Sequence, residues 1–319
     1  MRHLPLLWFF ALPPLSHACL WDRDTIASEK ARFPGVEEVI FGNFPRHSKE
    51  FYEWRKATSE AALTSDPSNL ALYDDLAVAQ HKLGDHEGAI ATMKKKDAIK
   101  PGLYETLSNT GTFYIYTGNL TAALEQIDKA LAVNPNAHFG REKYQKWLIG
   151  WAIDKMPDEL RDGGDSYPGT GGFAGYVVDK QPVGKRKLTE ELRQEAIAAL
   201  SGMMRFGDFD NPLLQEAMAD FLAAGPSDDN ATRHAGLAYL HAIGRTTDLA
   251  ALARLKVKRE RALSTLEDAE KQKRLMPNIL KQGLAKGVSL TQQVSKDEIA
   301  WIAAGKDASA EFQKKYLKP

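Results

Sequence analysis

The sequence predicts an all-α fold built from helical hairpins, and three observations lead to that prediction. Two stretches within residues 70–137 repeat each other at one constant interval, without a gap. Elsewhere apolar side chains recur at i, i+3, i+4 and i+7, as they do from Tyr144 to Trp151, which is the spacing of one helix face. Glycine and proline stand where the predicted helices would end. Together these patterns indicate an array of paired helices.

The repeat is defined by matched residue types. Segment 70–103 aligns with segment 104–137 over its whole length. Small residues match small residues, apolar residues match apolar ones, and each unit carries a glycine near its middle and a closing proline. The matched pairs are Tyr73 and Leu107, Ala77 and Gly111, Gly84 and Gly118, Ala89 and Ala123, Met93 and Ile127, and Pro101 and Pro135.

Each matched position has a steric reason. Gly84 and Gly118 fall at the expected turn between two helices, where a residue without Cβ can take a positive φ. Pro101 and Pro135 end the second helix, because proline lacks the N–H and clashes with the preceding turn. One such unit cannot bury its apolar face alone, so units stack on their neighbours.

The pattern resembles the tetratricopeptide repeat family, in its exported bacterial type, over two full units. The resemblance implies a right-handed solenoid of helical hairpins that binds a protein or peptide on its concave face. Some positions depart from the family pattern: Lys96 stands where Ala130 stands one unit later, and Gln80 where Tyr114 does. The segment 48–69 resembles the second helix of a degenerate preceding unit, in which Arg55 stands where Ala89 stands one unit later.

In the resembled family the first helices of successive units line the binding groove. The members that bind chaperones hold a peptide carboxylate with Lys and Asn at such places, and this chain does not supply that clamp. A ligand recognised by its C-terminal carboxylate is therefore disfavoured. The residues that would face the groove here are Asp74, Val78, His81, Ser108, Thr112, Ile115, Glu142 and Lys146.

The first residues read as an export signal. Residues 1–18 combine Arg2, an apolar run too short to span a bilayer and a small-x-small sequence before Cys19. Cleavage after Ala18 would leave Cys19 first, which is the lipid-attachment position of bacterial lipoproteins. Ser16 stands where such signals usually carry leucine, so the alternative is a free secreted chain with one thiol. We therefore expect a periplasmic or secreted protein that contacts a membrane only through a lipid at Cys19.

The remaining chain divides around the array. We expect a packed N-terminal cap at 19–47, the array at 48–160, a loop rich in Gly and Pro at 161–187, and a C-terminal helical region with a degenerate hairpin at 188–319. Asn211 and Pro212 read as the N-cap and first residue of a helix. Residues 248–276 read as a long charged helix capped by Thr246 or Thr247, through which copies of the chain could self-associate. Ser295 reads as the N-cap of a later short helix.

Composition narrows the classes of function. The chain of 319 residues has 42 Lys plus Arg and 42 Asp plus Glu, so nothing in the balance indicates nucleic acid, for which a basic patch is expected. A single cysteine excludes an intramolecular disulfide and a zinc site built on cysteines. The eight histidines show no ligand spacing, so we expect neither a metal nor a cofactor.

No catalytic motif stands out. The glycines of GTGGFAGY at 169–176 follow a helix end and a turn, whereas a phosphate-binding fingerprint follows a strand. The sequence therefore favours a non-catalytic protein-interaction scaffold of the bacterial cell envelope. The alternative is an enzyme or small-ligand binder whose site the 161–187 loop forms against the array.

Overall fold

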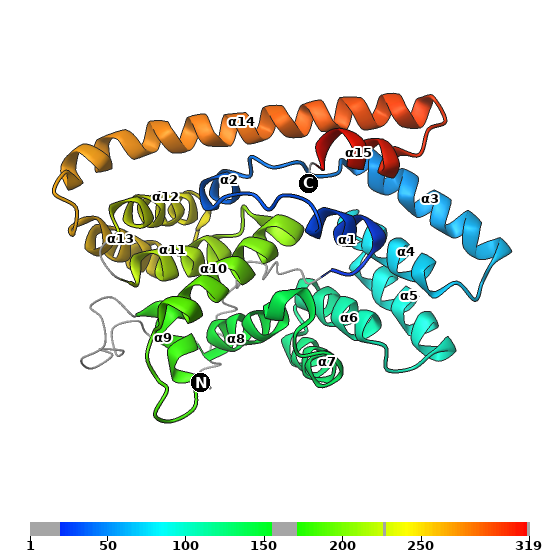
Figure 1. Ribbon diagram of the computed structural model, residues 1–319, viewed down its shortest axis with the longest axis horizontal. Coiled ribbons are helices and arrows are strands. Elements are labelled where there is room, and N and C mark those ends of the chain that lie inside the picture. The colour runs from blue at the N-terminus through cyan, green and yellow to red at the C-terminus, as the bar shows by residue number, and fades with distance from the viewer. Residues whose placement is uncertain (1–19, 155–170, 226–227, 318–319) are drawn as a thin grey trace, which may run out of the picture.

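The computed structural model of the protein describes residues 20–154, 171–225 and 228–317 (Figure 1). Within those ranges the chain forms fifteen α-helices and no strand, and successive helices pack as antiparallel pairs, which confirms the all-α prediction. The first eight helices are α1 (Arg23–Glu29), α2 (Val36–Phe41), α3 (Lys49–Ser65), α4 (Leu70–Lys82), α5 (His86–Ile99), α6 (Tyr104–Tyr116), α7 (Leu120–Val133) and α8 (Arg141–Asp154). The others are α9 (Gly172–Asp179), α10 (Glu190–Met203), α11 (Pro212–Ala223), α12 (Asp229–Arg245), α13 (Leu249–Leu263), α14 (Ala269–Ala303) and α15 (Ala308–Tyr316).

The hairpins α4–α5 and α6–α7 follow the register of the sequence repeat. When α6 is aligned with α4 at its first residue, every later helix start and end in the two hairpins also coincides. Their turns contain Gly84 at φ 88° and Gly118 at φ 78°, the left-handed backbone that favours glycine. Gly111 allows close packing of α6 on α7, since a Cβ there would lie 2.9 Å from Cγ1 of Ile127. The turns and the small position therefore lie where the sequence predicts them.

The second half of the chain, from α8 to α13, surrounds the largest apolar core. Its buried members come from almost every helix of that half, and they include Tyr144, Phe173, Leu200, Phe221 and Tyr239. Asn211 caps α11 as predicted, because its side chain accepts hydrogen bonds from the backbone N–H groups of Leu213 and Leu214. The N-cap of α13 is Asp248, and the prediction of Thr246 or Thr247 is wrong.

Part of the predicted loop at 161–187 is helical, which corrects that prediction. Residues 172–179 form α9, whose side chains Phe173, Tyr176 and Val177 are buried. The glycines around this segment suggested a loop, but an apolar helix of eight residues is stabilised by the core it enters. Residues 161–170 lie outside the described residues.

The long C-terminal helix exists, but its predicted bounds are wrong. The segment 248–276 is not one helix, because α13 ends at Leu263 and α14 starts at Ala269. Helix α14 then continues for 35 residues through Pro277. The proline ring is exposed, so water can bond the carbonyl group that proline leaves unpaired. Ser295 lies inside α14 and caps no helix.

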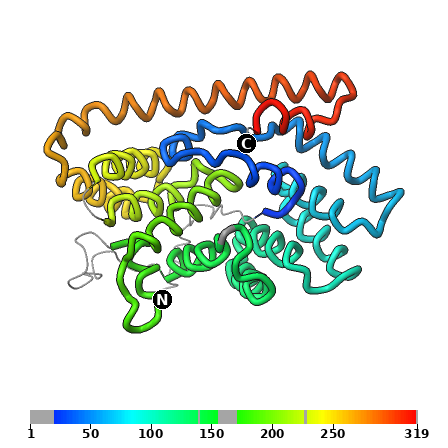
Figure 2. The backbone as a smooth tube through the Cα atoms, in the orientation of Figure 1, coloured from blue at the N-terminus to red at the C-terminus, as the bar shows by residue number. Residues whose placement is uncertain are grey.

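Helix α14 connects the two ends of the helical arrangement. It packs against α12 near its start, against α2 along its middle and against α3 near its end, and Figures 1 and 2 show it along one edge of the molecule. Two glycines allow the approach to α2. A Cβ on Gly283 would lie 2.3 Å from the Phe41 ring, and one on Gly287 would lie 2.7 Å from the Phe41 and Gly42 carbonyl oxygens.

Candidate functional site

The residues predicted to face a groove are mostly not exposed in the structure. All of them except Lys146 are buried, on the face of α4, α6 and α8. Lys146 lies at the edge, where its ammonium group is 2.5 Å from Asp128. Val78 and Ile115 belong to two separate apolar clusters. A segment of the chain far away in sequence covers the part of this face around Val78 and Asn109.

The covering segment is residues 20–23, of which the last, Arg23, is the first residue of α1. The Asn109 side-chain amide accepts a hydrogen bond from the Trp21 N–H at 2.8 Å and donates one to the Trp21 carbonyl oxygen at 2.9 Å. Leu20 is buried in the apolar cluster of Val78 and Phe113. The Trp21 ring meets Tyr104 and His138 edge to face, at centroid distances of 5.4 and 4.9 Å. A non-helical piece of backbone that leads to the extended residue Asp22 is thus held by the peptide groups of Trp21 and by its side chains.

Charges attach the same segment to the surrounding helices. The Arg23 N–H donates to Asp75 Oδ1 at 3.2 Å, and its guanidinium group lies 2.5 Å from Asp75 Oδ2. On α1, Asp24 accepts two hydrogen bonds from the Arg55 guanidinium group, at 3.0 and 2.7 Å. Asp24 also accepts a hydrogen bond from the hydroxyl of Ser309 on α15. Helix α1 is therefore bonded both to the array and to the C-terminal helix of the chain.

The far end of α1 is held by a second charged group. Glu29 accepts a hydrogen bond of 2.7 Å from Nη2 of Arg141 and lies 2.7 Å from Nδ1 of His138. Burial opposes ionisation of Glu29, but His138 and Arg141 outweigh that cost, and the pKa of Glu29 is lowered. The carboxylate therefore stays charged between its two partners.

Buried carboxylates lie both beneath the covering segment, at Asp74, and within it, at Asp22. Asp74 accepts two hydrogen bonds from Lys96, at 2.7 and 2.6 Å, and both side chains are almost fully buried. Burial raises the pKa of Asp74 to about 7, although the charge of Lys96 acts in the opposite direction. Burial, together with the charges of Asp24 and Asp75, raises the pKa of Asp22 to about 7.

The other predicted groove residues bond to one another or to neighbouring rings. Glu142 accepts hydrogen bonds from the hydroxyls of Tyr104 and Ser108, and the Gln145 amide donates to the Thr112 hydroxyl at 3.4 Å. His81 lies 3.1 Å from His86 between their Nδ1 atoms and packs on Phe113 and Tyr116. Burial, followed by the charges of Lys82 and His86, lowers the pKa of the His81 imidazole well below its usual value. His81 is therefore neutral near pH 7.

The sequence patterns did not indicate the residues that hold the segment, above all Asn109, Asp75 and Asp24. One signal could have found the contacts to charged residues. Arg55 and Lys96 interrupt the small and apolar pattern of their helices, yet both are buried. Because a buried cation needs a carboxylate partner, these departures indicate that acidic residues lie opposite them.

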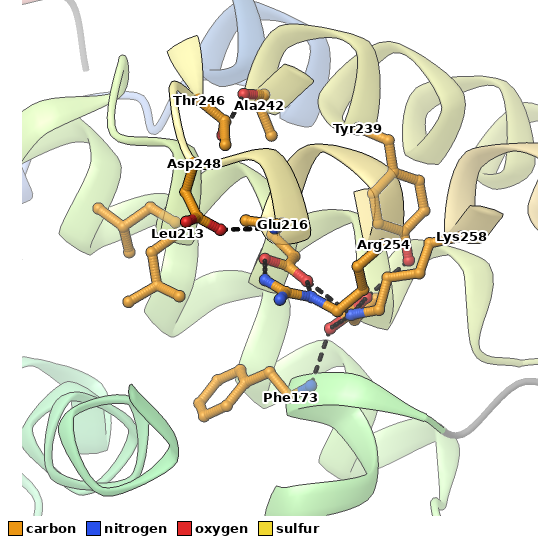
Figure 3. A network of polar contacts seen from close by, with 12 residues as sticks. Phe173, Leu213, Glu216, Tyr239, Ala242, Thr246, Asp248, Arg254 and Lys258 are labelled. Carbon is orange, nitrogen blue, oxygen red and sulfur yellow. Dashed lines mark hydrogen bonds and ion pairs between the residues drawn. The ribbon is translucent and has the colours of Figure 1, made fainter. Parts of the chain in front are cut away.

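A second polar centre lies beside α9, where the alternative prediction placed a site. Lys258 donates to Glu216 at 2.8 Å and to the two Asp220 oxygens at 3.0 and 3.1 Å. Arg254 also bonds Glu216, and the Tyr239 hydroxyl donates to Asp220 at 2.6 Å (Figure 3). Burial opposes ionisation of Glu216, but Lys258 and Arg254 outweigh it and lower its pKa.

The backbone of α9 is part of the same centre. The Phe173 N–H donates to Asp220 Oδ2 at 2.8 Å (Figure 3). Gly172 has φ 63°, and a Cβ there would lie 2.1 Å from Asp220 Oδ2. The two carboxylates thus bond two cations, a hydroxyl and a peptide N–H, so this centre joins α9 to α11, α12 and α13.

The two histidines that share a face of α12 have different neighbours. His241 Nε2 lies 2.6 Å from Asp210, whereas His234 lies 3.4 Å from Glu37. Among the described residues no group of three or more His, Cys, Asp or Glu side chains is arranged to hold a metal ion. Within the same residues no helix is long and apolar enough to cross a membrane. Cys19 and the predicted signal at 1–18 lie outside the described residues.

The fold places the chain among all-α proteins whose helices pack as successive antiparallel pairs. No model of a protein family matches the chain, and a search of the curated proteins finds no significant match.

Proposed function

We propose that the protein is a non-catalytic protein-interaction scaffold of the bacterial cell envelope that binds an extended peptide segment on the face of α4, α6 and α8. The observation that carries the proposal is the pair of hydrogen bonds between Asn109 and the backbone of Trp21. On the side of the segment these bonds involve only peptide groups, so they can form with an extended segment of another chain. In this protein the chain's own residues 20–23 occupy the face.

We also propose the type of helical array to which the protein belongs. The hairpins α4–α5 and α6–α7 share one register and turn at glycines, which supports a right-handed solenoid of the tetratricopeptide repeat type. In such an array the first helix of each hairpin faces the ligand, and here α4 and α6 supply Asp75 and Asn109. The segment that they hold has an apolar residue, then an aromatic one, and a basic residue two positions later.

The test separates the segment from the rest of the chain without changing the array. A specific protease site is inserted between Lys30 and Ala31, beyond the end of α1, and the purified protein is cleaved in its folded state. We expect the released piece to stay bound and to exchange with a labelled peptide of residues 20–30. Gel filtration and fluorescence anisotropy measure the retention and the exchange.

Two substitutions decide which contact is responsible. Asn109→Ala removes both bonds to Trp21 and is expected to weaken peptide binding by roughly tenfold or more, since each lost bond is worth about 1 kcal/mol. Asn136→Ala, at an exposed position, is the matched control and is expected to leave binding unchanged. If the cleaved piece separates at once and no labelled peptide binds, α4, α6 and α8 do not form a peptide site.

Export and lipid attachment also stay proposals. They rest on residues 1–18 and Cys19 in the sequence. Mass spectrometry of the protein's first residues in a bacterial envelope fraction would give the cleavage site. An added mass of acyl chains on Cys19 would establish the lipid, and an unmodified thiol would contradict it.

Self-association through 248–276 also stays a prediction. Leu249 and Val257 of α13 are exposed apolar residues in this segment, which favours the idea. Sedimentation equilibrium over a range of concentrations is the direct measurement, and a monomer at every concentration would contradict it.

A further inference from the structure

The outward face of α14 is basic over most of its length. From Lys271 to Lys296 the sequence contains six Lys or Arg residues and no Asp or Glu. Lys271, Arg274, Lys281, Lys286 and Lys296 are all exposed. The whole chain has equal numbers of basic and acidic residues, so this stretch carries a local excess of positive charge.

The basic residues lie opposite the face that holds α14 to the protein. The buried residues of this helix are Met276, Gly283, Gly287, Val294 and Glu298, which recur at helical spacing. Within the described part of the chain, Lys281, Lys286 and Lys296 have no ion-pair partner. Their charges therefore point away from the molecule and are free to attract an external anion.

The shape of the face favours a flat partner. Helix α14 has 35 residues, which is about 52 Å of nearly continuous helix along one edge of the molecule (Figure 1). Leu275 and Ile279 are exposed among the basic residues near its start. Lysines spread along a line with apolar side chains between them match the headgroup region of an anionic bilayer, where the charges stay at the surface and the apolar groups enter.

We propose that the outer face of α14 adsorbs to a membrane that carries anionic phospholipids. This contact is separate from the peptide face and from any lipid at Cys19. Its attraction is electrostatic and weakens with salt, because exposed charges are screened within a Debye length. Each basic residue near such a surface strengthens partitioning by about fivefold.

The experiment uses the full chain with Cys19→Ser, so that no acyl chain at that position contributes. Sedimentation compares vesicles of phosphatidylcholine with vesicles that also contain phosphatidylglycerol. We expect stronger partitioning to the anionic vesicles and a steady loss of it as salt is added. The triple variant Lys281→Glu, Lys286→Glu and Lys296→Glu is expected to lose on the order of a hundredfold or more in partitioning to anionic vesicles, since each change removes an attractive charge and adds a repulsive one.

A matched variant controls for net charge. Lys94→Glu, Lys95→Glu and Lys100→Glu make the same charge change at exposed residues of α5 and its end. We expect a loss several times smaller, since these residues lie away from α14. The proposal is overturned if both triple variants lose vesicle partitioning equally, or if the chain without lysine substitutions binds the two vesicle types equally. It is also overturned if that chain binds duplex DNA but not anionic vesicles at the same salt.

Discussion

Two buried cations stand where the repeat pattern expects alanine, and each bonds a buried carboxylate. Arg55 occupies the position of Ala89 in the next unit and bonds Asp24. Lys96 occupies the position of Ala130 and bonds Asp74. Removing one member of such a buried pair leaves the other charge without compensation. These departures therefore have structural roles.

The pair of Arg55 and Asp24 provides a direct test at this scale. Arg55→Met removes both hydrogen bonds to Asp24 and leaves that carboxylate buried, so we expect a loss of about 3–5 kcal/mol in the free energy of unfolding. Lys56→Met, on the same helix, breaks only an exposed pair with Glu60 and should cost about 1 kcal/mol or less. Urea denaturation measures the unfolding free energy of both variants. Equal losses would contradict a stabilising role of the buried pair of Arg55 and Asp24.

The buried carboxyl of Asp22 predicts a dependence on pH. Its pKa is raised from 3.8 to about 7, so the folded state binds the proton more tightly than the unfolded state does. This group therefore stabilises the fold below about pH 4, and that contribution is lost as pH rises to about 7. The amide of an Asp22→Asn variant does not ionise in this range. The free energy of unfolding of the variant, relative to that of wild type, should therefore rise between pH 5 and pH 8 by on the order of a few kcal/mol.

The control for this prediction is another helix cap. Asp85→Asn changes an exposed cap whose side chain also accepts a backbone hydrogen bond. Comparing the two variants separates the effect of burial from the loss of a cap charge. A difference between Asp22→Asn and wild type that stays constant with pH would show that Asp22 is ionised throughout.

Among the elements, α9 depends most clearly on tertiary contacts. It has eight residues, and isolated helices of that length are marginal in water. The N–H of Phe173 donates to Asp220 on α11, Gly172 lies against the same carboxylate, and Lys258 on α13 bonds it as well. The position of α9 is therefore set by the charged centre as well as by the buried Phe173.

Lys258→Met tests that centre. The change leaves Glu216 with Arg254 alone and removes one cation from Asp220, so we expect a loss of about 3–5 kcal/mol in unfolding free energy. Hydrogen exchange should also become faster in α9. Lys256→Met, an exposed lysine on the same helix, is expected to stay within about 0.5 kcal/mol of wild type. Unchanged exchange in α9 in the Lys258 variant would show that the apolar core alone holds this helix.

At the scale of the whole molecule, α14 joins elements from both ends of the chain. It contacts α2 and α3 from the N-terminal part and α12 and α13 from the C-terminal part. His47 adds a polar contact, with its Nδ1 2.6 Å from Glu298 Oε1. The arrangement is thus closed by contacts that are distant in sequence.

Gly287→Ala probes this closure. The added Cβ would lie 2.7 Å from two backbone carbonyl oxygens of α2 and its end, so α14 must move away, at an expected cost of about 1–3 kcal/mol. Gly244→Ala is the matched control, because no atom lies within 4 Å of the added Cβ, and alanine should stabilise that helix by roughly 0.5 kcal/mol. In thermal unfolding we expect Gly287→Ala to lower Tm and Gly244→Ala to raise it. Changes of Tm with the same sign would contradict the close contact between α14 and α2.

Local patterns in the sequence predicted the two hairpins and the cap at Asn211, whereas the caps predicted at Thr246 or Thr247 and at Ser295 are wrong. The glycine turns of the two hairpins and the cap at Asn211 depend on neighbours within a few residues. The predicted groove residues were placed on the correct helices, but their exposure could not be predicted. Their burial depends partly on contacts between the array helices and partly on residues 20–29, which pack on α4, α6 and α8 from as many as 112 positions away.

The sequence by itself determined that the chain is helical, where its two regular hairpins turn and which of their faces is apolar, since helical spacing and turn residues act locally. Only the tertiary structure decided that α9 is a helix, that α14 continues past Pro277 and that Asn109 holds the backbone of Trp21. Each of these depends on contacts between residues far apart in the chain, whose free energy exceeds the local preference. Part of the face that the sequence marked for a ligand is covered by the chain's own first helix and its leading residues.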